Sequence, residues 1–253
     1  YTDYLTTIEV LNVAPTVSAG ADQIVNEGSS VTLTATAGDP ADPLLYLWTV
    51  VSSNGQIVPS GTGSTFTFTP NNDGTYTVLL KVIEDDGQDS ASTEDIVEIT
   101  VLNTVPTATI ANDGPVDEGQ TATVTMSATD TSALDANSLR YAFDFNNDGI
   151  FEIGNGTYGG SITAQSVVVP NSYLADGPSV RTIRGRVIDP SGDYSEYTTD
   201  ITVNNVAPTA TIDANSSLTE TAPTLTGTFR FTDPGTDSWT AIVNYGDGTI
   251  VNL

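Results

Sequence analysis

Apolar and polar residues alternate with a period of two along most of this chain. In residues 31–35, Val, Leu and Ala alternate with Thr, and residues 124–128 place Val, Met and Ala between Thr and Ser. Segments 78–82 and 183–187 carry apolar residues at every second position. A period of two is typical of half-buried β-strands, and no segment shows the 3.6-residue period of a long amphipathic helix. The pattern therefore predicts an all-β protein.

A short linker sequence occurs three times. It reads Val-Leu-Asn-Val-Ala-Pro-Thr at residues 10–16, Val-Leu-Asn-Thr-Val-Pro-Thr at 101–107 and Val-Asn-Asn-Val-Ala-Pro-Thr at 203–209. Proline cannot donate a hydrogen bond to a sheet and favours an extended residue before it, so each linker ends one strand and begins a new repeat.

An acidic, alternating segment precedes each linker, at residues 4–11, 92–102 and 194–203. We expect each of these segments to be the last strand of a repeat. Short strands, frequent turn residues and repeats of about 90–100 residues predict tandem antiparallel β-sandwiches. The expected domains are residues 1–12 as the closing strand of a preceding repeat, 13–103 and 104–205 as two full repeats, and 206–253 as the N-terminal half of an incomplete third repeat.

Composition and charge narrow the function classes. The 253 residues carry a formal net charge of −26, so phosphate backbones and anionic membrane surfaces repel the chain, and we expect no nucleic-acid partner. We expect no direct membrane insertion either, because no segment approaches the roughly 20 apolar residues of a membrane helix. With no His and no Cys, only oxygen ligands remain for a metal, and these suit calcium or magnesium.

Three sequence features point to a family. They are Asn-Asp-Gly-Thr-Tyr-Thr-Val at residues 72–78, Trp239 followed by Asn-Tyr-Gly-Asp-Gly at 244–248, and the Val-Ala-Pro-Thr linkers. Together they resemble the PKD-like (polycystic kidney disease-type) repeats of bacterial and archaeal surface proteins. The first repeat departs from this pattern at residues 48–55, and the middle repeat departs at 178–181. The resemblance implies immunoglobulin-like sandwiches and an extracellular or cell-surface location in the cell envelope.

One segment of the middle repeat matches the start of an acidic calcium loop, with oxygen ligands at alternate positions and glycine at the sixth. The expected ligands are Asp144, Asn146, Asp148, the carbonyl of Ile150, and Glu152. The twelfth position is Asn155 instead of the bidentate glutamate of an EF-hand. A plain hairpin turn explains the same residues, because Asn-Asp-Gly suits a tight turn. Calcium binding and a simple turn both remain open.

Two further acidic clusters lie near repeat ends. They are Glu84-Asp85-Asp86 with Asp89, and Asp117-Glu118. Such clusters can trap calcium between neighbouring repeats, although acidic turns are more often simply solvated. We expect solvated turns here.

A catalytic function would need a carboxylate pair such as Asp144 with Glu152, acting as glycosidase acid and base. The chain has no His to tune proton transfer near neutral pH, and nothing in the sequence indicates a cleft. We therefore expect no enzymatic activity. Trp48 and Trp239 fit sugar-stacking platforms, but each lies on an apolar strand face and is better explained by core packing.

The sequence favours a non-enzymatic structural or adhesive segment of a large secreted or cell-surface protein, such as a stalk, coat or S-layer-like array, stiffened by calcium. The alternative is a carbohydrate- or protein-binding accessory module of a larger extracellular enzyme. The expected partners are neighbouring repeats of the same polypeptide, with like subunits or cell-surface glycans as further candidates.

Overall fold

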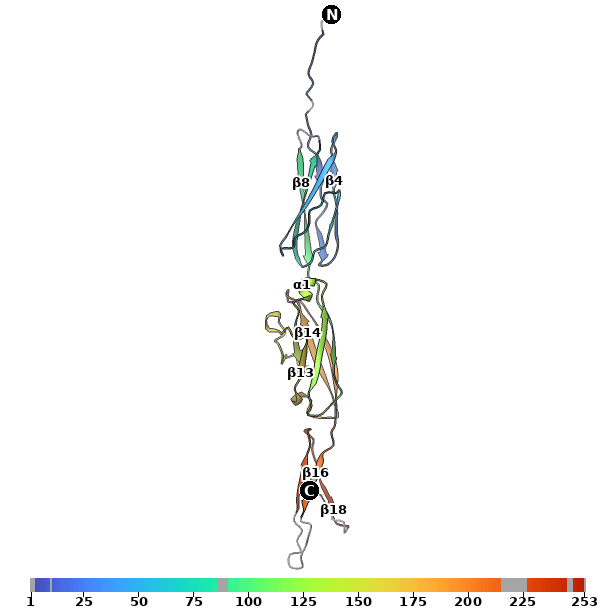
Figure 1. Cartoon of the computed structure of the whole chain (residues 1–253), viewed down its shortest axis with the longest axis vertical. Helices are drawn as coiled ribbons and strands as arrows, with labels where there is room; N and C mark the ends of the chain where they lie inside the picture. The colour runs from blue at the N-terminus through green and yellow to red at the C-terminus, as the bar shows by residue number, and fades with distance from the viewer. Residues whose placement is uncertain (1–2, 10, 86–90, 215–226, 245–247, 253) are drawn as a thin grey trace, which may run out of the picture. The chain divides into compact units, whose positions relative to one another are not determined.

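The structure, a computed structural model, describes residues 3–9, 11–85, 91–214, 227–244 and 248–252 (Figure 1). Its contacts divide the chain into two units. The first contains Tyr1–Pro106, Thr129–Leu139 and Asp189–Asp193, and the second contains Thr107–Ala128, Arg140–Ile188 and Tyr194–Leu253. The fold is all-β, as predicted, and is built from immunoglobulin-like sheets whose strands pair mainly antiparallel.

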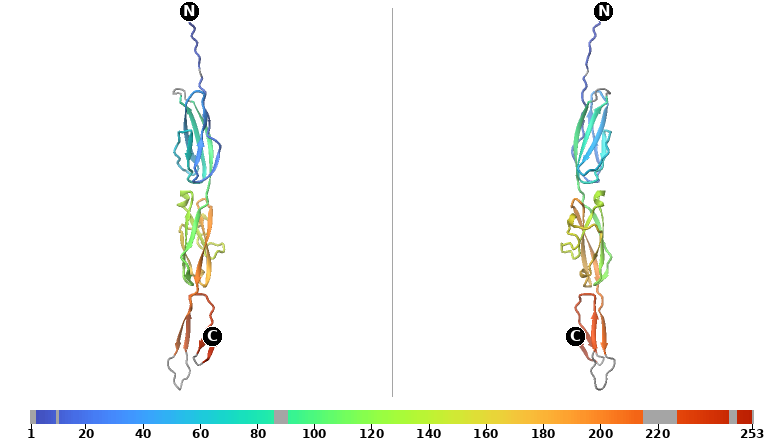
Figure 2. Two further views of the ribbon diagram at one scale, coloured as in Figure 1. Left: turned by 90° about the vertical axis from the view of Figure 1, so that its right-hand side faces the viewer. Right: turned by 60° about the vertical axis from the view of Figure 1, so that its left-hand side comes forward.

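Among the described residues of the first repeat, eight strands form a sandwich. They are β1 (Thr16–Ser18), β2 (Gln23–Asn26), β3 (Val31–Thr34), β4 (Thr36–Gly38), β5 (Leu44–Ser52), β6 (Thr65–Phe68), β7 (Gly74–Glu84) and β8 (Ser92–Leu102). One sheet has the order β2-β8-β7-β5, and β3 pairs with β6 while β1 pairs with β4. Figure 2 shows the strands of this sandwich, coloured blue to green, from two further sides. In the β5–β7 ladder Trp48 lies opposite Leu80, which places the alternating apolar residues of both strands on one face.

The core of this sandwich lies between the four-stranded sheet and the β3–β6 pair. Rings from both sides meet there, because Phe66 of β6 stacks on Trp48 of β5 and Phe68 of β6 contacts Tyr76 of β7. The alternation that predicted half-buried strands therefore delivers one apolar face per strand to a common core.

The second repeat has a similar arrangement, with one continuous three-stranded sheet in place of the two separate strand pairs. Its strands are β9 (Thr107–Asn112), β10 (Val116–Asp117), β11 (Ala122–Thr129), β12 (Arg140–Asp144), β13 (Ser166–Val169), β14 (Ser179–Ile188) and β15 (Tyr194–Asn204). One sheet has the order β10-β15-β14-β12 and the other has the order β13-β11-β9. Short helices interrupt the strands: α1 (Ala133–Ala136), η1 (Tyr158–Gly160) and η2 (Asn171–Tyr173).

The described part of residues 206–253 contains two hairpin-like pairs. Strand β16 (Thr209–Ala214) pairs with β17 (Gly227–Thr232), and β18 (Ile242–Asn244) pairs with β19 (Ile250–Asn252). The described sheets each draw their strands from within one predicted repeat.

Three features differ from the sequence-based expectations. The strand expected over residues 4–11 is not formed at the described residues, which are exposed and lack the partner strand that a ladder requires. The sandwiches are not wholly antiparallel, since β2 pairs with β8 and β10 with β15 in parallel. Helix α1 was not predicted, and its start is fixed by the Ser132 hydroxyl, which accepts the Asp135 N–H at 3.2 Å.

Two of the three predicted closing strands are confirmed, as β8 and β15. Among the described residues, no helix has both the length and the apolar character needed to cross a membrane.

Candidate metal centre

The predicted calcium loop begins where β12 ends. Asp144 is the last residue of this strand and is 0% exposed. Its Oδ1 accepts N–H bonds from Asn146 at 3.2 Å and Asp148 at 3.3 Å, and its Oδ2 accepts the Gly149 N–H at 2.9 Å. Gly149 has a φ of 99°, a conformation that favours glycine. The backbone thus wraps around the Asp144 carboxylate.

Hydrogen bonds within the loop position Asn146, Asp148 and Glu152. Asp148 accepts the side-chain amide of Asn146 at 2.9 Å and the N–H of Ile150 at 2.8 Å. Glu152 accepts the Phe145 N–H at 2.6 Å. One carboxylate oxygen each from Asp144, Asp148 and Glu152 lies within 4.8 Å of the others. The structure therefore brings together the three predicted carboxylates and one amide.

A cation from the protein already occupies this loop. Arg184 Nη2 on strand β14 lies 2.7 Å from Asp144 Oδ2, and the Arg184 side chain is 21% exposed. Burial tends to raise the pKa of Asp144, but the Gly149 N–H and the Arg184 guanidinium hold it below its usual value. A metal ion here would share Asp144 with the guanidinium. Sequence analysis missed Arg184, which is 40 residues away and is brought opposite Asp144 by the β12–β14 register.

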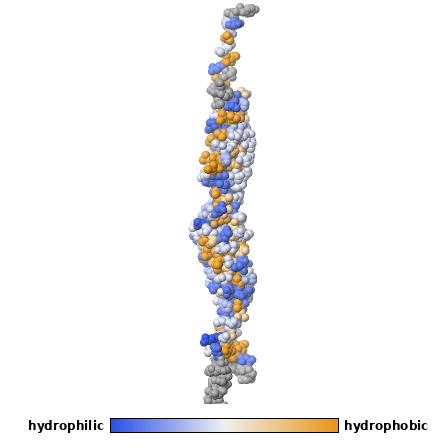
Figure 3. Space-filling model, viewed as in Figure 1, coloured by the Kyte–Doolittle hydropathy of each residue, from blue (hydrophilic) through white to orange (hydrophobic). Residues whose placement is uncertain are grey.

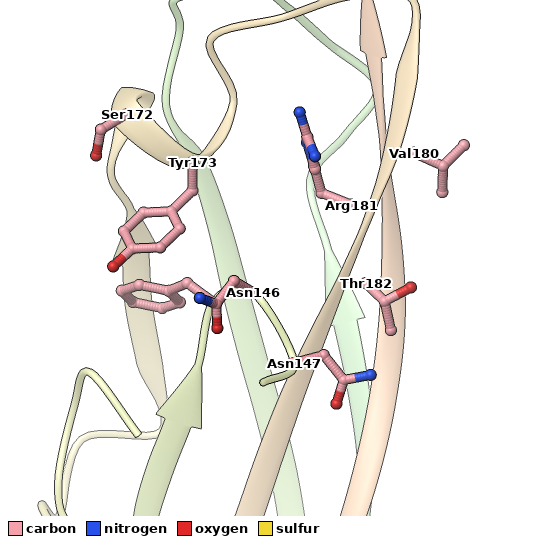
Figure 4. A pocket seen from close by; sticks show the side chains of 8 residues that line it. Asn146, Asn147, Ser172, Tyr173, Val180, Arg181 and Thr182 are labelled. Atoms are coloured by element: carbon pink, nitrogen blue, oxygen red, sulfur yellow. The ribbon is translucent and has the colours of Figure 1, made fainter. Parts of the chain in front are cut away.

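A shallow hollow of about 450 Å³ lies beside the loop (Figure 4). Its lining is mostly polar and includes Phe145, Asn146, Asn147, Ser172, Tyr173, Val180, Arg181 and Thr182. None of these residues is a carboxylate, so the hollow does not supply an acid and base pair for glycoside hydrolysis.

The two other predicted clusters are more buried than expected. Glu84 is fully buried, accepts the Ala91 N–H at 2.7 Å and lies within 4.8 Å of Asp39 and Asp42, oxygen to oxygen. Glu118 is also fully buried and forms a similar group with acidic residues of the 233–237 segment. The expectation of solvated turns is wrong for these two glutamates, because tertiary packing covers both. Asp86 and Asp89 lie outside the described residues.

A further acidic group escaped sequence analysis. Glu27, in the turn after β2, lies with Asp130 and Asp135 so that one carboxylate oxygen of each is within 4.8 Å of the others. Glu27 lies more than 100 positions before Asp130 and Asp135 in the chain, so no local spacing reveals the group. The available signal was the recurrence of Glu-Gly after an Asn or Asp at residues 26–28 and 117–119.

The two tryptophans differ. Trp48 is fully buried, stacks on Phe66 at 5.7 Å and donates its indole N–H to the Gly63 carbonyl at 2.8 Å, so its prediction as a core residue is confirmed. Trp239 is 38% exposed and contacts Phe231 at 5.4 Å between ring centroids. Among the described residues, the prediction that Trp239 packs in a core is wrong, because the β16–β17 pair beside it covers only part of the ring.

A known protein family matches the first repeat. Residues 12–101 match the family model described as PKD domain. The resemblance to PKD-like repeats is therefore confirmed for this segment. No curated protein sequence matches the chain significantly.

Several solved structures are similar. The PKD domain (329–428) from human KIAA0319 is 28% identical over 36% of this chain and 82% of its own, with a TM-score of 0.29. The mouse nectin-like molecule 4 ectodomain (Ig1–Ig3) is 16% identical over 75% of this chain, with a TM-score of 0.33, and this chain spans only 64% of its length. The fibronectin(III)-like modules of Clostridium thermocellum CbhA are 15% identical over 75% of this chain and 94% of their own, with a TM-score of 0.29.

Proposed function

We propose that this chain, whose residues 12–101 belong to the PKD domain family, is a non-enzymatic structural or adhesive segment of a large secreted or cell-surface protein. PKD and immunoglobulin-like domains are typically non-catalytic modules found outside the cell or on its surface. In finer terms, we propose that the chain is part of a stalk, coat or S-layer-like array that calcium stiffens.

One observation carries this proposal: two sandwiches of similar topology follow each other in the chain, and each has a core of its own. Trp48, Tyr76 and Leu80 are fully buried in the first, and Phe143 and Ile183 are fully buried in the second. A sandwich that buries its own core resists extension without help from a ligand or substrate. Such modules suit a load-bearing spacer.

The surface suits an extracellular spacer as well. The face in Figure 3 shows apolar residues in small separate groups among polar ones. A net charge of −26 keeps copies of the chain apart and attracts divalent cations.

The loop from Asp144 to Glu152 remains our proposed calcium site within the second repeat. Its support is the convergence of three carboxylates within 4.8 Å. Because Arg184 already neutralises part of that charge, we expect weak affinity, in the roughly 10⁻⁴ to 10⁻³ M range of extracellular calcium modules.

Single-molecule force spectroscopy of the full chain tests the structural role. We expect two separate unfolding steps, each releasing up to roughly 300 Å of chain at about 3.3–3.6 Å per residue. The matched control is Leu80→Ala, which should weaken one step and leave the other unchanged, because Leu80 is buried in the first core only. A single step, or extension without resistance, would contradict the proposal.

A second candidate is the accessory binding module, favoured by one observation. Trp239, Phe229 and Phe231 line a hollow of about 300 Å³ together with Pro208 and Ile242. Exposed aromatic rings can stack on sugars. Quenching of Trp239 fluorescence by soluble oligosaccharides, absent in Trp239→Ala, would support this candidate, and unchanged emission across a glycan panel would remove it.

A further inference from the structure

We propose that Glu27, Asp130 and Asp135 bind a divalent cation of the calcium class, and that a related site recurs around Glu118. This inference is independent of the calcium loop at Asp144 and goes beyond the structural role proposed above.

The first group is built to present oxygen atoms that the protein leaves without partners. Glu27 is 1% exposed and Asp135 is 2% exposed. Glu27 Oε2, Asp130 Oδ2 and Asp135 Oδ2 are buried without a hydrogen-bond partner among the described residues. Buried polar atoms are almost always paired, so three unpaired carboxylate oxygens in one group need an explanation. A bound cation provides one.

Backbone donors fix two of these carboxylates while leaving one oxygen of each available. The Thr104 N–H donates to Glu27 Oε1 at 2.9 Å, and the Ser132 N–H donates to Asp130 Oδ1 at 2.9 Å. The second oxygen of each is the unpartnered one. Preorganised carboxylates of this kind bind an ion without first having to be ordered.

Among the described residues, no ion pair supplies a counter-charge to this group. Within the described part of the chain, ion pairs involve Lys81, Arg184 and Arg186, and none of these reaches the group. Burial raises the pKa of Glu27 to about 7, and burial together with the neighbouring Asp130 raises the pKa of Asp135 to about 6. These directions are those of carboxylates that lack a compensating cation.

The ligand set identifies the class of ion. All the available atoms are oxygens, and three carboxylates offer enough negative charge for a divalent cation. Calcium accepts six to eight oxygen ligands in irregular geometry, whereas zinc and copper prefer the imidazole and thiolate groups that this chain lacks. The chemistry therefore favours calcium.

Glycine allows the close approach that forms the group. Gly28 follows Glu27 with a φ of 72°, and a Cβ on it would lie 2.6 Å from Thr131 Cγ2, next to Asp130. Any other residue at position 28 would be strained at this φ and would require the Thr131 side chain to shift. The Glu-Gly pair thus combines a ligand with the space it needs.

The same construction appears around Glu118. The Val206 N–H donates to Glu118 Oε1 at 2.8 Å, and Val206 occupies the linker position that Thr104 has in the first group. Asp233 and Asp237 take the places of Asp130 and Asp135, with Asp233 Oδ2 buried and unpartnered.

The two glycines match as well. Gly119 has a φ of 73°, and a Cβ on it would lie 2.8 Å from the Pro234 carbonyl oxygen. The groups differ in their free oxygens. Among the described residues, the second group has only Asp233 Oδ2 buried without a partner, and Glu118 Oε2 accepts the Gly177 N–H at 2.9 Å. We therefore expect tighter binding at the Glu27 group, where that oxygen is available.

Calcium titration of the full chain tests the proposal, using calorimetry and melting curves in calcium and in chelator. We expect saturable binding, a melting temperature raised by calcium, and the loss of one site in Glu27→Gln. Glu98→Gln is the matched control, because Glu98 is an exposed carboxylate on β8, and it should keep every site. Glu118→Gln should remove a different, weaker site.

The sign of the stability change separates ion binding from a merely structural role. In chelator, Glu27→Gln should melt at or above the wild-type temperature, because it removes an uncompensated buried charge. In calcium it should melt below wild type. A variant that is less stable by the same amount in both conditions would overturn the proposal.

Two further outcomes would also overturn it. One is a wild-type chain that shows no saturable binding below about 10 mM calcium in equilibrium dialysis, a limit above the range of extracellular sites. The other is a Glu27→Gln chain that retains every wild-type site. If Glu27→Gln does not fold, Asp135→Asn takes its place with the same expected losses, and the wild-type dialysis result still decides. Asp148→Asn tests the separate loop, so failure of one site is distinguishable from failure of the other.

Discussion

Replacing Arg184 by glutamine would reveal whether this guanidinium is the built-in counterion of the Asp144 loop. Arg184 Nη2 lies 2.7 Å from Asp144 Oδ2, and the Asp144 side chain is completely buried. Glutamine keeps much of the side-chain length and its capacity to hydrogen bond but removes the positive charge. The variant therefore leaves a buried carboxylate without its ion-pair partner.

The structure sets the size of the expected loss. Removing one partner of a buried ion pair typically costs about 3–5 kcal/mol. Asp144 keeps N–H bonds from Asn146, Asp148 and Gly149, and Arg184 is partly exposed, so we expect a lower value of about 2–3 kcal/mol. For a repeat of about 100 residues, this lowers the melting temperature by roughly 10–20 °C.

Melting curves in chelator at neutral pH measure this loss. The matched control is Arg186→Gln, two residues along the same strand, where the guanidinium pairs with Glu196 at 2.7 Å and donates to the Gly156 carbonyl at 2.8 Å. Loss of the Arg186–Glu196 ion pair should lower the free energy of unfolding by about 1 kcal/mol or less. Loss of the hydrogen bond to the Gly156 carbonyl should add somewhat to this value. If Arg184→Gln melts within about 2 °C of wild type, a shift worth less than 1 kcal/mol, Arg184 is not the counterion.

Calcium should partly restore the stability of Arg184→Gln, because a divalent ion can take the place of the lost guanidinium charge. A tenfold excess of calcium over the dissociation constant contributes about 1.4 kcal/mol. Calorimetry should show tighter calcium binding at the loop in Arg184→Gln than in wild type. Equal or weaker binding would show that the guanidinium does not compete with the ion.

Three further predictions concern other parts of the molecule. Leu80→Ala should lower the free energy of unfolding of the first sandwich by about 2–5 kcal/mol in urea titration, and a loss below about 1 kcal/mol would show that the cavity collapses. The Thr123 N–H donates to Asp113 Oδ1 at 2.7 Å and lowers the pKa of Asp113. The ionised Asp113 therefore stabilises the fold above the unfolded-state pKa of about 3.9, and this stabilisation is lost as the pH falls through the lower folded-state pKa. Asp113→Asn should therefore melt below wild type at pH 7, and the difference should shrink as the pH falls through the folded-state pKa of Asp113; a difference that stays the same on acidification would contradict this reasoning. Asp148→Asn should abolish calcium binding by the loop in calorimetry while leaving the Glu27 site intact, and an unchanged titration would exclude the loop as a ligand set.

Much of the fold could be predicted from the sequence because strand alternation and turn residues are local signals. The closing strands at β8 and β15 and the buried Trp48 followed from period-two patterning and from the linker prolines. The parallel pairings of β2 and β10 could not be predicted in this way. Periodicity reports which face of a strand is buried and carries no information about its neighbour in the sheet.

The candidate sites likewise combine features that local sequence predicts with features that only tertiary structure decides. The loop from Asp144 to Glu152 was predictable because its ligands lie within nine consecutive residues, and the structure brings its carboxylates together. Tertiary structure alone decided that Arg184 neutralises Asp144, since the two residues meet through strand register.

The sequence by itself determined that the chain forms repeated all-β modules with an acidic surface and only oxygen ligands for a metal. Only the tertiary structure placed Glu27 beside Asp130 and Asp135, more than 100 residues later. Packing leaves one carboxylate oxygen of each residue buried without a partner among the described residues, and it does so by combining a turn, a linker and a short helix from separate parts of the chain. Burial and the distance between charges are properties of the folded chain, so local spacing cannot show where charges are buried together.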